Sequence, residues 1–142
     1  MPSKLSLVTA TLAAIFASTA PAQIPANCSR MYEVVADDTC DIISAAQNVS
    51  TFQLAHVNAA VINPDCTNLW VGEVTICLGL NGQDCTSTHK IVSGDSCWDI
   101  FVTEGIDLAT LLANNPNVDN ACSNIYPDEV ICTASEVIAY DP

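Results

Sequence analysis

The chain has 142 residues, of which 50% are hydrophobic and 13% are charged. This length allows one ordinary domain or two very small ones, and nothing larger. Sixteen Asp and Glu against three Lys and Arg give a formal net charge of −13, which repels phosphate backbones and anionic lipid headgroups. The composition therefore predicts no nucleic-acid partner and no membrane partner, and it favours a partner that is neutral or cationic.

The N-terminal segment has the pattern of a secretory signal peptide. Lys4 precedes the apolar stretch Leu5–Phe16, and small residues then lead to Ala20-Pro21-Ala22. A membrane-spanning helix would need about 20 mostly apolar residues. This stretch is shorter and is interrupted by Ser and Thr. We therefore expect a signal peptide over residues 1–22, cleaved after Ala22, and a secreted, extracellular chain.

The eight cysteines reveal an internal repeat. They lie at positions 28, 40, 66 and 77, and then at 85, 97, 122 and 132, so the gaps are 12, 26, 11 and again 12, 25, 10. At an offset of 57 residues, eight residues of the first copy, Asp38 and Asn58 among them, meet identical residues in the second. The sequence therefore predicts two modules, residues 28–78 and 85–133, with a short linker over residues 79–84 and a C-terminal tail over residues 134–142.

Each module is expected to run strand, helix, helix, strand. In the first, a strand over Tyr32–Val35 precedes a helix from Cys40. A second short helix follows the cap Ser50 and stops near Asn58, and a strand over Val74–Cys77 closes the module. Turn residues with N-capping hydroxyls stand between the first strand and the first helix. They support the strand–helix order that the hydrophobic periodicity indicates.

The second module repeats this order. Its elements are a strand over His89–Val92, a helix from the cap Ser96 to a stop at Gly105, a helix after the cap Asp107 that ends near Asn115, and a strand over Glu129–Cys132. Cys97, Ile100 and Phe101 share one apolar stripe of the first helix, because they stand at i, i+3 and i+4. The mixture of strands and helices predicts an α+β fold.

A module of about 50 residues buries too little apolar surface to be stable without staples. We therefore expect all cysteines to form disulfides within their own modules. The residues concerned are Cys28, Cys40, Cys66, Cys77, Cys85, Cys97, Cys122 and Cys132. Four cysteines allow three pairings, and antiparallel strands favour Cys28 with Cys77 and Cys40 with Cys66. No metal is expected, because the nearest cysteines are eight residues apart and zinc ligands come in closer pairs such as C-x₂-C.

Two acceptor patterns for N-glycosylation agree with secretion. They are Asn27-Cys28-Ser29 and Asn48-Val49-Ser50. Glycans at Asn27 and Asn48 are therefore expected, and the mature chain is predicted to be a glycoprotein.

The order and spacing of these residues resemble a known family. The segments that carry the resemblance are Ser93–Ile100 (SGDSCWDI), Leu112–Val118 (LANNPNV), Cys122, Val130-Ile131-Cys132 and, in the first module, Tyr32–Cys40 (YEVVADDTC) and Leu69–Glu73 (LWVGE). They look like the LysM module, in the four-cysteine form of secreted fungal LysM effectors. The similarity extends from Cys28 to Cys132 and is strengthened by the duplication.

The resemblance implies a βααβ fold with both helices on one face of a two-stranded sheet. It also implies binding of chitin or chitin oligosaccharides, which are polymers of N-acetylglucosamine, without catalysis and without a cofactor. Chitin is neutral, so the acidic chain does not repel it. The family's groove lies between the loop after the first strand and the loop after the second helix.

Carried over by position, the ligand-binding residues come from these two loops in each module. In the second module they are Gly94, Asp95, Ser96, Trp98, Asn115, Asn117, Val118 and Asp119. In the first module they are Asp37, Asp38, Thr39, Asp41, Asn58, Ala60, Val61 and Ile62.

Three positions depart from the family pattern. Asp37 stands where the pattern has Gly, Ala59 where it has Pro, and Asp128 where it has the Gly before the last strand. The first two departures affect the groove of the first module, since Asp is costly in left-handed backbone and Ala leaves the loop less rigid. We therefore expect the second module to be the better binder.

Structural roles stand beside these assignments. Asp38, Thr39, Asp95 and Ser96 are also suited to capping helices. Trp98 stands in the first helical turn, where a Trp more often packs over the module than stacks on a sugar. Trp70 and Tyr126 hold matching positions before the last strands and are expected in the core or on the groove floor. His56 and His89 share no position in the repeat and are expected to be structural.

Several functions are compatible with the pattern. The first is a stand-alone effector, and hence a virulence factor, that hides chitin fragments from a host's receptors or shields a fungal wall from chitinases. Association with the wall and a ligand-bridged dimer belong to this hypothesis. The alternatives are a structural disulfide-rich wall protein and the targeting module of a chitin- or peptidoglycan-degrading enzyme. An enzyme is not expected in the chain itself, because no cluster of acidic motif residues is present.

Overall fold

The computed structural model describes residues 24–64, 66–69, 71–72 and 74–140. The expected signal peptide lies outside the described residues. Within them, two modules share one element order, and the fold is α+β. The first module contains β1 (Cys28–Glu33), α1 (Cys40–Gln47), α2 (Thr51–Val57) and β2 (Thr75–Leu80). The second contains β3 (Thr88–Lys90), α3 (Cys97–Glu104), α4 (Leu108–Asn114) and β4 (Val130–Cys132).

Each module has one antiparallel pair of strands. The end pairs of the ladders are Cys28 with Leu80 and Glu33 with Thr75 in the first module, and Thr88 with Cys132 and Lys90 with Val130 in the second. The first pair is longer than the sequence predicts, because β1 already begins at Cys28 and β2 continues through Leu80 into the expected linker. The Asn81-Gly82 turn supports this extension. The Asn81 N–H donates to the Asn27 carbonyl at 2.9 Å, and Gly82 has a φ of 81°.

All four helices begin at the capping residues that the sequence predicts. Thr39, Ser50, Ser96 and Asp107 each accept a hydrogen bond from a backbone N–H three residues later, at Ile42, Gln53, Asp99 and Thr110. The first helix of each module ends on left-handed backbone, with φ of 70° at the expected stop Gly105 and 50° at Asn48. Gly and Asn are the residues that tolerate this helix end best.

Each module has its own core between its helices and its sheet. The largest apolar side chains that are fully buried are Ile43, Leu54 and Ile76 in the first module and Ile100, Leu111 and Ile131 in the second. The disulfides are Cys28–Cys77, Cys40–Cys66, Cys85–Cys132 and Cys97–Cys122. Every bridge therefore stays within one module, and those of the first module are the pairs that antiparallel strands favour.

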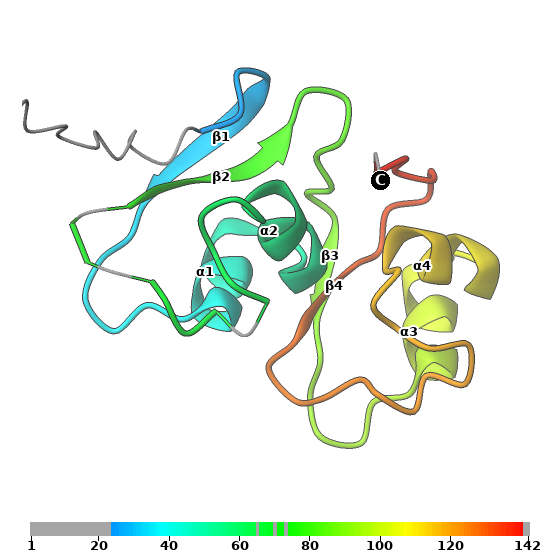
Figure 1. Cartoon of the computed structure of the whole chain (residues 1–142). Coiled ribbons are helices and arrows are strands. Elements are labelled where there is room, and N and C mark those ends of the chain that lie inside the picture. The colour runs from blue at the N-terminus through cyan, green and yellow to red at the C-terminus, as the bar shows by residue number, and fades with distance from the viewer. Residues whose placement is uncertain (1–23, 65, 70, 73, 141–142) are drawn as a thin grey trace, which may run out of the picture.

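The two modules stack head to tail. β4 contacts both α1 and α2 of the first module as well as α4 of its own. The layers therefore follow the order first sheet, α1 and α2, second sheet, α3 and α4 (Figure 1). One hydrogen bond across this contact joins the Val130 N–H in β4 to Thr51 Oγ1 at the start of α2, at 3.0 Å. The second sheet is thus packed between two pairs of helices.

Asp84 fixes the linker to the first module. Its carboxylate accepts two hydrogen bonds from the Arg30 guanidinium, at 2.7 and 2.8 Å, and others from Ser29 and Gln53. Gln53 is fully buried and also accepts from the Cys85 N–H at 2.8 Å. Although desolvation opposes it, this set of hydrogen bonds and the guanidinium charge lower the pKa of Asp84. The second module therefore starts from a point anchored in the first.

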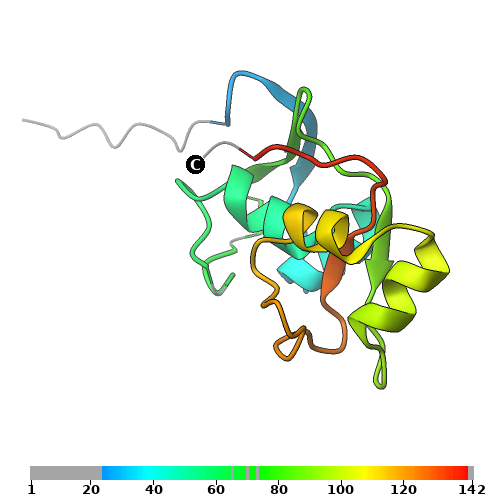
Figure 2. The ribbon, with the colours of Figure 1, turned by 90° about the vertical axis from the view of Figure 1, so that its right-hand side faces the viewer.

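The C-terminal tail returns from β4 toward the first module (Figure 2). The buried side chain of Asn114 donates to the carbonyls of Ala134 and Glu136 and accepts from the Ile138 N–H. Tyr140 then packs edge-on against the rings of Phe52 and His56 in α2, and its hydroxyl donates to Gln53. The tail is therefore part of the contact between the modules, and His56 has a packing role, as expected.

Candidate functional site

Two clefts occupy equivalent places in the two modules, between the loop after the first strand and the segment after the second helix. The cleft of the second module, of about 310 Å³, is lined by Asp95, Ser96, Cys97, Trp98, Phe101, Leu108, Asn120, Ala121 and Cys122. The cleft of the first module, of about 450 Å³, is lined by Thr39, Cys40, Asp41, Thr51, Pro64, Cys66, Thr67 and Tyr126. The repeat places Thr39, Asp41 and Thr51 where Ser96, Trp98 and Leu108 stand.

A disulfide holds the two sides of each cleft together. Cys97 begins α3 and Cys122 belongs to the loop after α4, and both line the cleft of the second module. Cys40 and Cys66 do the same in the first. Both Cys66 and Cys122 have a φ of 53°, so the bridge and the backbone bend are repeated. A covalent bond therefore ties the two loops of each cleft together.

The turn before each first helix is closed by an aspartate. The Asp95 carboxylate accepts from the Val92 N–H and bonds to His89 Nε2, both at 2.9 Å, and these interactions lower the pKa of Asp95. Asp38 accepts from the Val35 N–H at 2.8 Å and from the Tyr32 hydroxyl at 3.1 Å. The two aspartates therefore shape the loop, and His89 has the structural role that we expected.

Left-handed backbone precedes these aspartates in both modules. The φ of Gly94 is 99°, and that of Asp37 is 69°. A Cβ placed on Gly94 would meet no atom within 4 Å. The glycine is therefore needed for its left-handed backbone conformation and not because the site lacks room for a side chain. A second left-handed bend precedes the last strand, and there the first module has the glycine and the second the aspartate. The φ of Gly72 is 71°, and that of Asp128 is 76°. Each module thus uses one Gly and one Asp for the same two bends.

Trp98 is the most prominent aromatic side chain of the second cleft. It is 68% exposed and packs edge-on against Phe101, with 5.0 Å between the ring centroids. The neighbouring Ser96 hydroxyl both accepts from the Asp99 N–H and donates to the Asp99 carboxylate. The cleft therefore presents an indole beside hydroxyl and carboxylate groups that local hydrogen bonds already hold.

Several expected site residues lie outside the lining of the clefts. Asn58 and Asn115 are buried, and each amide bridges a helix end to the last strand, with bonds to the backbone of Cys77 and Cys132. Ile62 and Val118 pack in the cores. The asparagine at this repeat position is therefore a structural bridge whose side chain does not reach the cleft.

The remaining loop residues hold the loops themselves. The Asp119 carboxylate accepts from the N–H groups of Ala121 and Ser123 and from the Ser123 hydroxyl, and this lowers its pKa. Asn117 donates to the buried Glu129 at 2.7 Å. Ala60 is exposed and Val61 half-buried near the corresponding loop of the first module. Asp119, Asn117, Ala60 and Val61 line neither cleft, and neither do Gly94, Asp37 and Asp38.

Other lining residues escaped the sequence analysis. Those of the second module are Phe101, Leu108, Asn120 and Ala121, and those of the first are Thr51, Pro64 and Thr67. The cysteine pairing carries a signal for some of them, because a bridge from Cys97 to Cys122 brings residues 120–121 beside Ser96. Tyr126 is different, since it comes from the other module. It is 44% exposed and does not belong to a core, while Trp70 lies outside the described residues.

The expected glycosylation sites are exposed. Asn27 lies in the turn before β1, and Asn48 ends α1. Within the described residues, no helix has the length and apolar character that crossing a membrane requires. The same residues contain no group of three His, Cys, Asp or Glu side chains placed to hold a metal ion.

Comparison with known proteins identifies the modules. A family model described as LysM domain matches residues 32–74 and 89–133, together more than half of the chain. The chain is 28% identical over 136 residues to the secreted LysM effector ldpA of Aspergillus fumigatus, covering 75% of this chain and 35% of that protein. It is 33% identical over 119 residues to a secreted LysM effector of Pochonia chlamydosporia, covering 84% of this chain and 17% of that one.

Among solved structures, the spore cortex-lytic enzyme SleL of Bacillus megaterium is similar with a TM-score of 0.37 and 17% identity, over 72% of this chain and 21% of that chain. The chain spans half or less of the length of the curated relatives ldpA, ldpB and LysM1. Because the family model matches both repeats, with the strands, helices and clefts described above, the chain belongs to the LysM domain family.

Proposed function

We propose that the chain is a secreted, non-catalytic protein that binds chitin oligomers in the clefts of its two LysM modules. The observation that carries this proposal is the recurrence of one cleft at the same repeat positions, between the two loops where the family's groove is expected. We favour a functional cleft over an accident of packing, because the backbone around the cleft recurs in both copies although the lining side chains differ.

The chemistry of the clefts suits an N-acetylglucosamine polymer. Such a ligand is neutral, so the formal net charge of −13 opposes its approach neither in solution nor at the cleft. Its sugar rings have apolar faces that fit aromatic side chains such as Trp98, and its amides and hydroxyls find donors and acceptors in the loops.

The relatives' names support secretion and an effector role. The Aspergillus and Pochonia proteins are both named as secreted LysM effectors. We extend to this chain an extracellular location after removal of residues 1–22, and a role in sequestering chitin fragments or shielding a fungal wall. Association with the wall, glycans at Asn27 and Asn48, and a dimer bridged by a long oligomer are further parts of the proposal.

Calorimetry with a chitin hexamer, together with analysis of the sugars afterwards, tests the proposal. We expect binding heat and an intact hexamer. The absence of heat at millimolar ligand would favour a structural wall protein, and shortened sugars would show an enzyme. Peptidoglycan fragments in a parallel titration distinguish the two N-acetylglucosamine polymers, and a pull-down on insoluble chitin reports on the polymer itself.

A further inference from the structure

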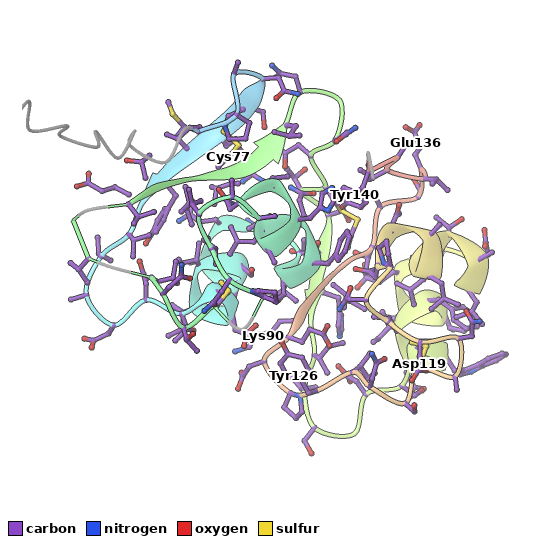
Figure 3. The ribbon with its side chains drawn as sticks, in the orientation of Figure 1. Cys77, Lys90, Asp119, Tyr126, Glu136 and Tyr140 are labelled. Atoms are coloured by element: carbon purple, nitrogen blue, oxygen red, sulfur yellow. A yellow bond between two sulfur atoms is a disulfide. The ribbon has the colours of Figure 1, made fainter. Side chains whose placement is uncertain are left out.

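The cleft of the first module contains an aromatic side chain from the second module. Tyr126 belongs to the segment before β4, yet it lines this cleft together with Thr39, Asp41 and Pro64. Figure 3 shows Tyr126 where the two modules meet, apart from Asp119 in the loop of its own module. The residue is 44% exposed, so its ring is available to a ligand.

The repeat shows what Tyr126 replaces. Asp41 stands at the position of Trp98, so the first module has a carboxylate where the second has an indole. Ser44, buried, stands at the position of Phe101. The first cleft therefore lacks both aromatic side chains that the second cleft draws from its own first helix. Tyr126 lies next to Asp41, the residue at the Trp98 position, because its hydroxyl is 3.5 Å from Asp41 Oδ1.

A chain of polar contacts holds Tyr126 in this place. Asp41 Oδ1 also accepts from the Thr51 hydroxyl at 3.2 Å, and Thr51 Oγ1 in turn accepts from the Val130 N–H. The Tyr126 backbone N–H donates to the buried Glu129 at 3.3 Å. Burial together with these carboxylates raises the pKa of Tyr126 to about 12, so its hydroxyl stays protonated and donates to Asp41. The contact between the modules thus positions the ring.

We propose that Tyr126 supplies the aromatic face of the saccharide cleft in the first module, in place of the Trp98 that serves the second. The inference rests on the proposed function, because it names a specificity-determining residue of that site. It makes binding in the first module dependent on the head-to-tail stacking of the modules. The second module carries its own aromatic side chains and does not share this dependence.

A titration of the full chain with a chitin tetramer, followed by ¹⁵N NMR, reads the two clefts separately. Amides of Thr39 and Thr67 report on the first cleft, and those of Ser96 and Ala121 on the second. We expect Tyr126→Ala to weaken binding at the first cleft roughly tenfold and leave the second within about twofold, since tenfold corresponds to about 1.4 kcal/mol, which one aromatic contact can supply. Tyr126→Phe retains the ring and should stay within about threefold of the native chain at the first cleft.

Two matched controls separate the role of the ring from that of the module contact. Trp98→Ala should give the mirror image, weakening the second cleft and sparing the first. Tyr140→Ala removes another aromatic side chain that joins the modules but lines neither cleft, and it should leave both affinities unchanged. If Tyr140→Ala weakens the first cleft as much as Tyr126→Ala does while the amides of β4 keep their native shifts, so that the modules are still stacked, the effect does not come from the Tyr126 ring and the proposal is wrong.

The native chain provides a test that needs no variant. Saturated with the chitin tetramer, it should show nuclear Overhauser effects between the ring protons of Tyr126 and the sugar. Their absence, with amides of the first cleft shifted by ligand, would overturn the proposal for Tyr126 and leave the proposed function standing. If no amide of either cleft shifts at millimolar ligand, the proposed function itself fails, and the role of Tyr126 fails with it.

Discussion

The clefts of the two modules share a backbone and differ in their lining. In both, a capping hydroxyl, a disulfide and a buried asparagine stand at equivalent positions. The second cleft is also lined by Trp98 and Phe101. The first has Asp41 at the Trp98 position and is lined by Tyr126 of the second module. The comparison teaches that the frame depends on a few residues with strict geometric roles, while side chains that face the cleft are free to diverge.

The two left-handed bends support the same conclusion. The bend before the first helix has Asp37 in the first module and Gly94 in the second. The bend before the last strand has Gly72 in the first module and Asp128 in the second. The two aspartates that depart from the family pattern therefore keep the left-handed backbone at these bends. What they alter is its cost, because Asp adopts left-handed backbone less readily than Gly.

The largest effect is expected from the disulfides that close the clefts. Replacing Cys97 and Cys122 by Ala, or Cys40 and Cys66, should lower the free energy of unfolding by about 2–5 kcal/mol in each case. The sequence separations are 25 and 26 residues, so the chain-entropy part is nearly equal in the two modules. Denaturant unfolding under non-reducing conditions measures both. A clear difference between them would show that stacking supports one module more than the other.

The left-handed bend before the first helix provides the next test. Gly94→Val places a branched side chain at a φ of 99° and should distort the loop of the second cleft. We expect a larger loss of chitin affinity than for Asp37→Val, with a difference of about 1–2 kcal/mol, since the second module is expected to be the better binder. Calorimetry with the hexamer measures it.

Gly82→Ala is the matched control for this pair. It strains another left-handed glycine, with a φ of 81°, in the linker turn away from both clefts, and it should leave affinity unchanged. Equal losses for Gly94→Val and Asp37→Val, or a larger loss for the latter, would contradict the ranking. That outcome would indicate one composite groove to which both modules contribute.

The linker anchor gives a pH-dependent comparison. The pKa of Asp84 is lower in the folded chain than its ordinary value of about 3.9, so its stabilisation is present above that value and is lost as the pH falls through the folded pKa. Asp84→Asn should cost about 1–2 kcal/mol at pH 7, because it leaves Arg30 without its charged partner. It should also remove part of the loss of stability below about pH 4. Unfolding curves from pH 2 to pH 7 test both statements, and a variant with unchanged pH dependence would refute them.

The smallest effect is expected at the ion pair of the second module. Lys90 and Asp128 are 2.8 Å apart, but their side chains are 51% and 68% exposed. Lys90→Gln should therefore change the free energy of unfolding by less than about 0.5 kcal/mol. This variant is the exposed counterpart of Asp84→Asn. A loss above about 1 kcal/mol would mean that the pair helps to hold α1 against the second module, where both residues border a cavity of about 630 Å³.

Much of each module could be predicted from the sequence, because the signals are local. Ser50 and Asp107 cap helices through bonds to residues three positions later, and Gly105 ends a helix by its own backbone conformation. The cysteine spacing predicted two copies, and antiparallel strands favoured the pairing that the structure has, although the sequence alone left three pairings open. Strand ends were less accurate, since β2 continues to Leu80 through cross-strand bonds that no local pattern specifies.

Side-chain roles in the candidate site were harder to predict. Asn58 and Asn115 are polar loop residues in sequence, and only the fold shows that they are buried bridges to the last strand. Asp38 and Asp95 close turns with the first strand, so their position beside a groove reflects loop construction. A polar residue in a loop is compatible with either role, and burial distinguishes them.

The sequence by itself determined the repeat, the α+β class and the helix caps, because each depends on residues close in the chain or repeated at a fixed offset. It favoured one disulfide pairing in the first module, and the structure decided it. Only the tertiary structure decided how the modules stack. Tyr126 meets Asp41 across 85 residues, and Tyr140 meets Gln53 across 87. Such contacts occur once and have no counterpart in the repeat, so no periodicity encodes them. They follow from the packing of β4 against α1 and α2, which depends on the shapes of the two folded surfaces.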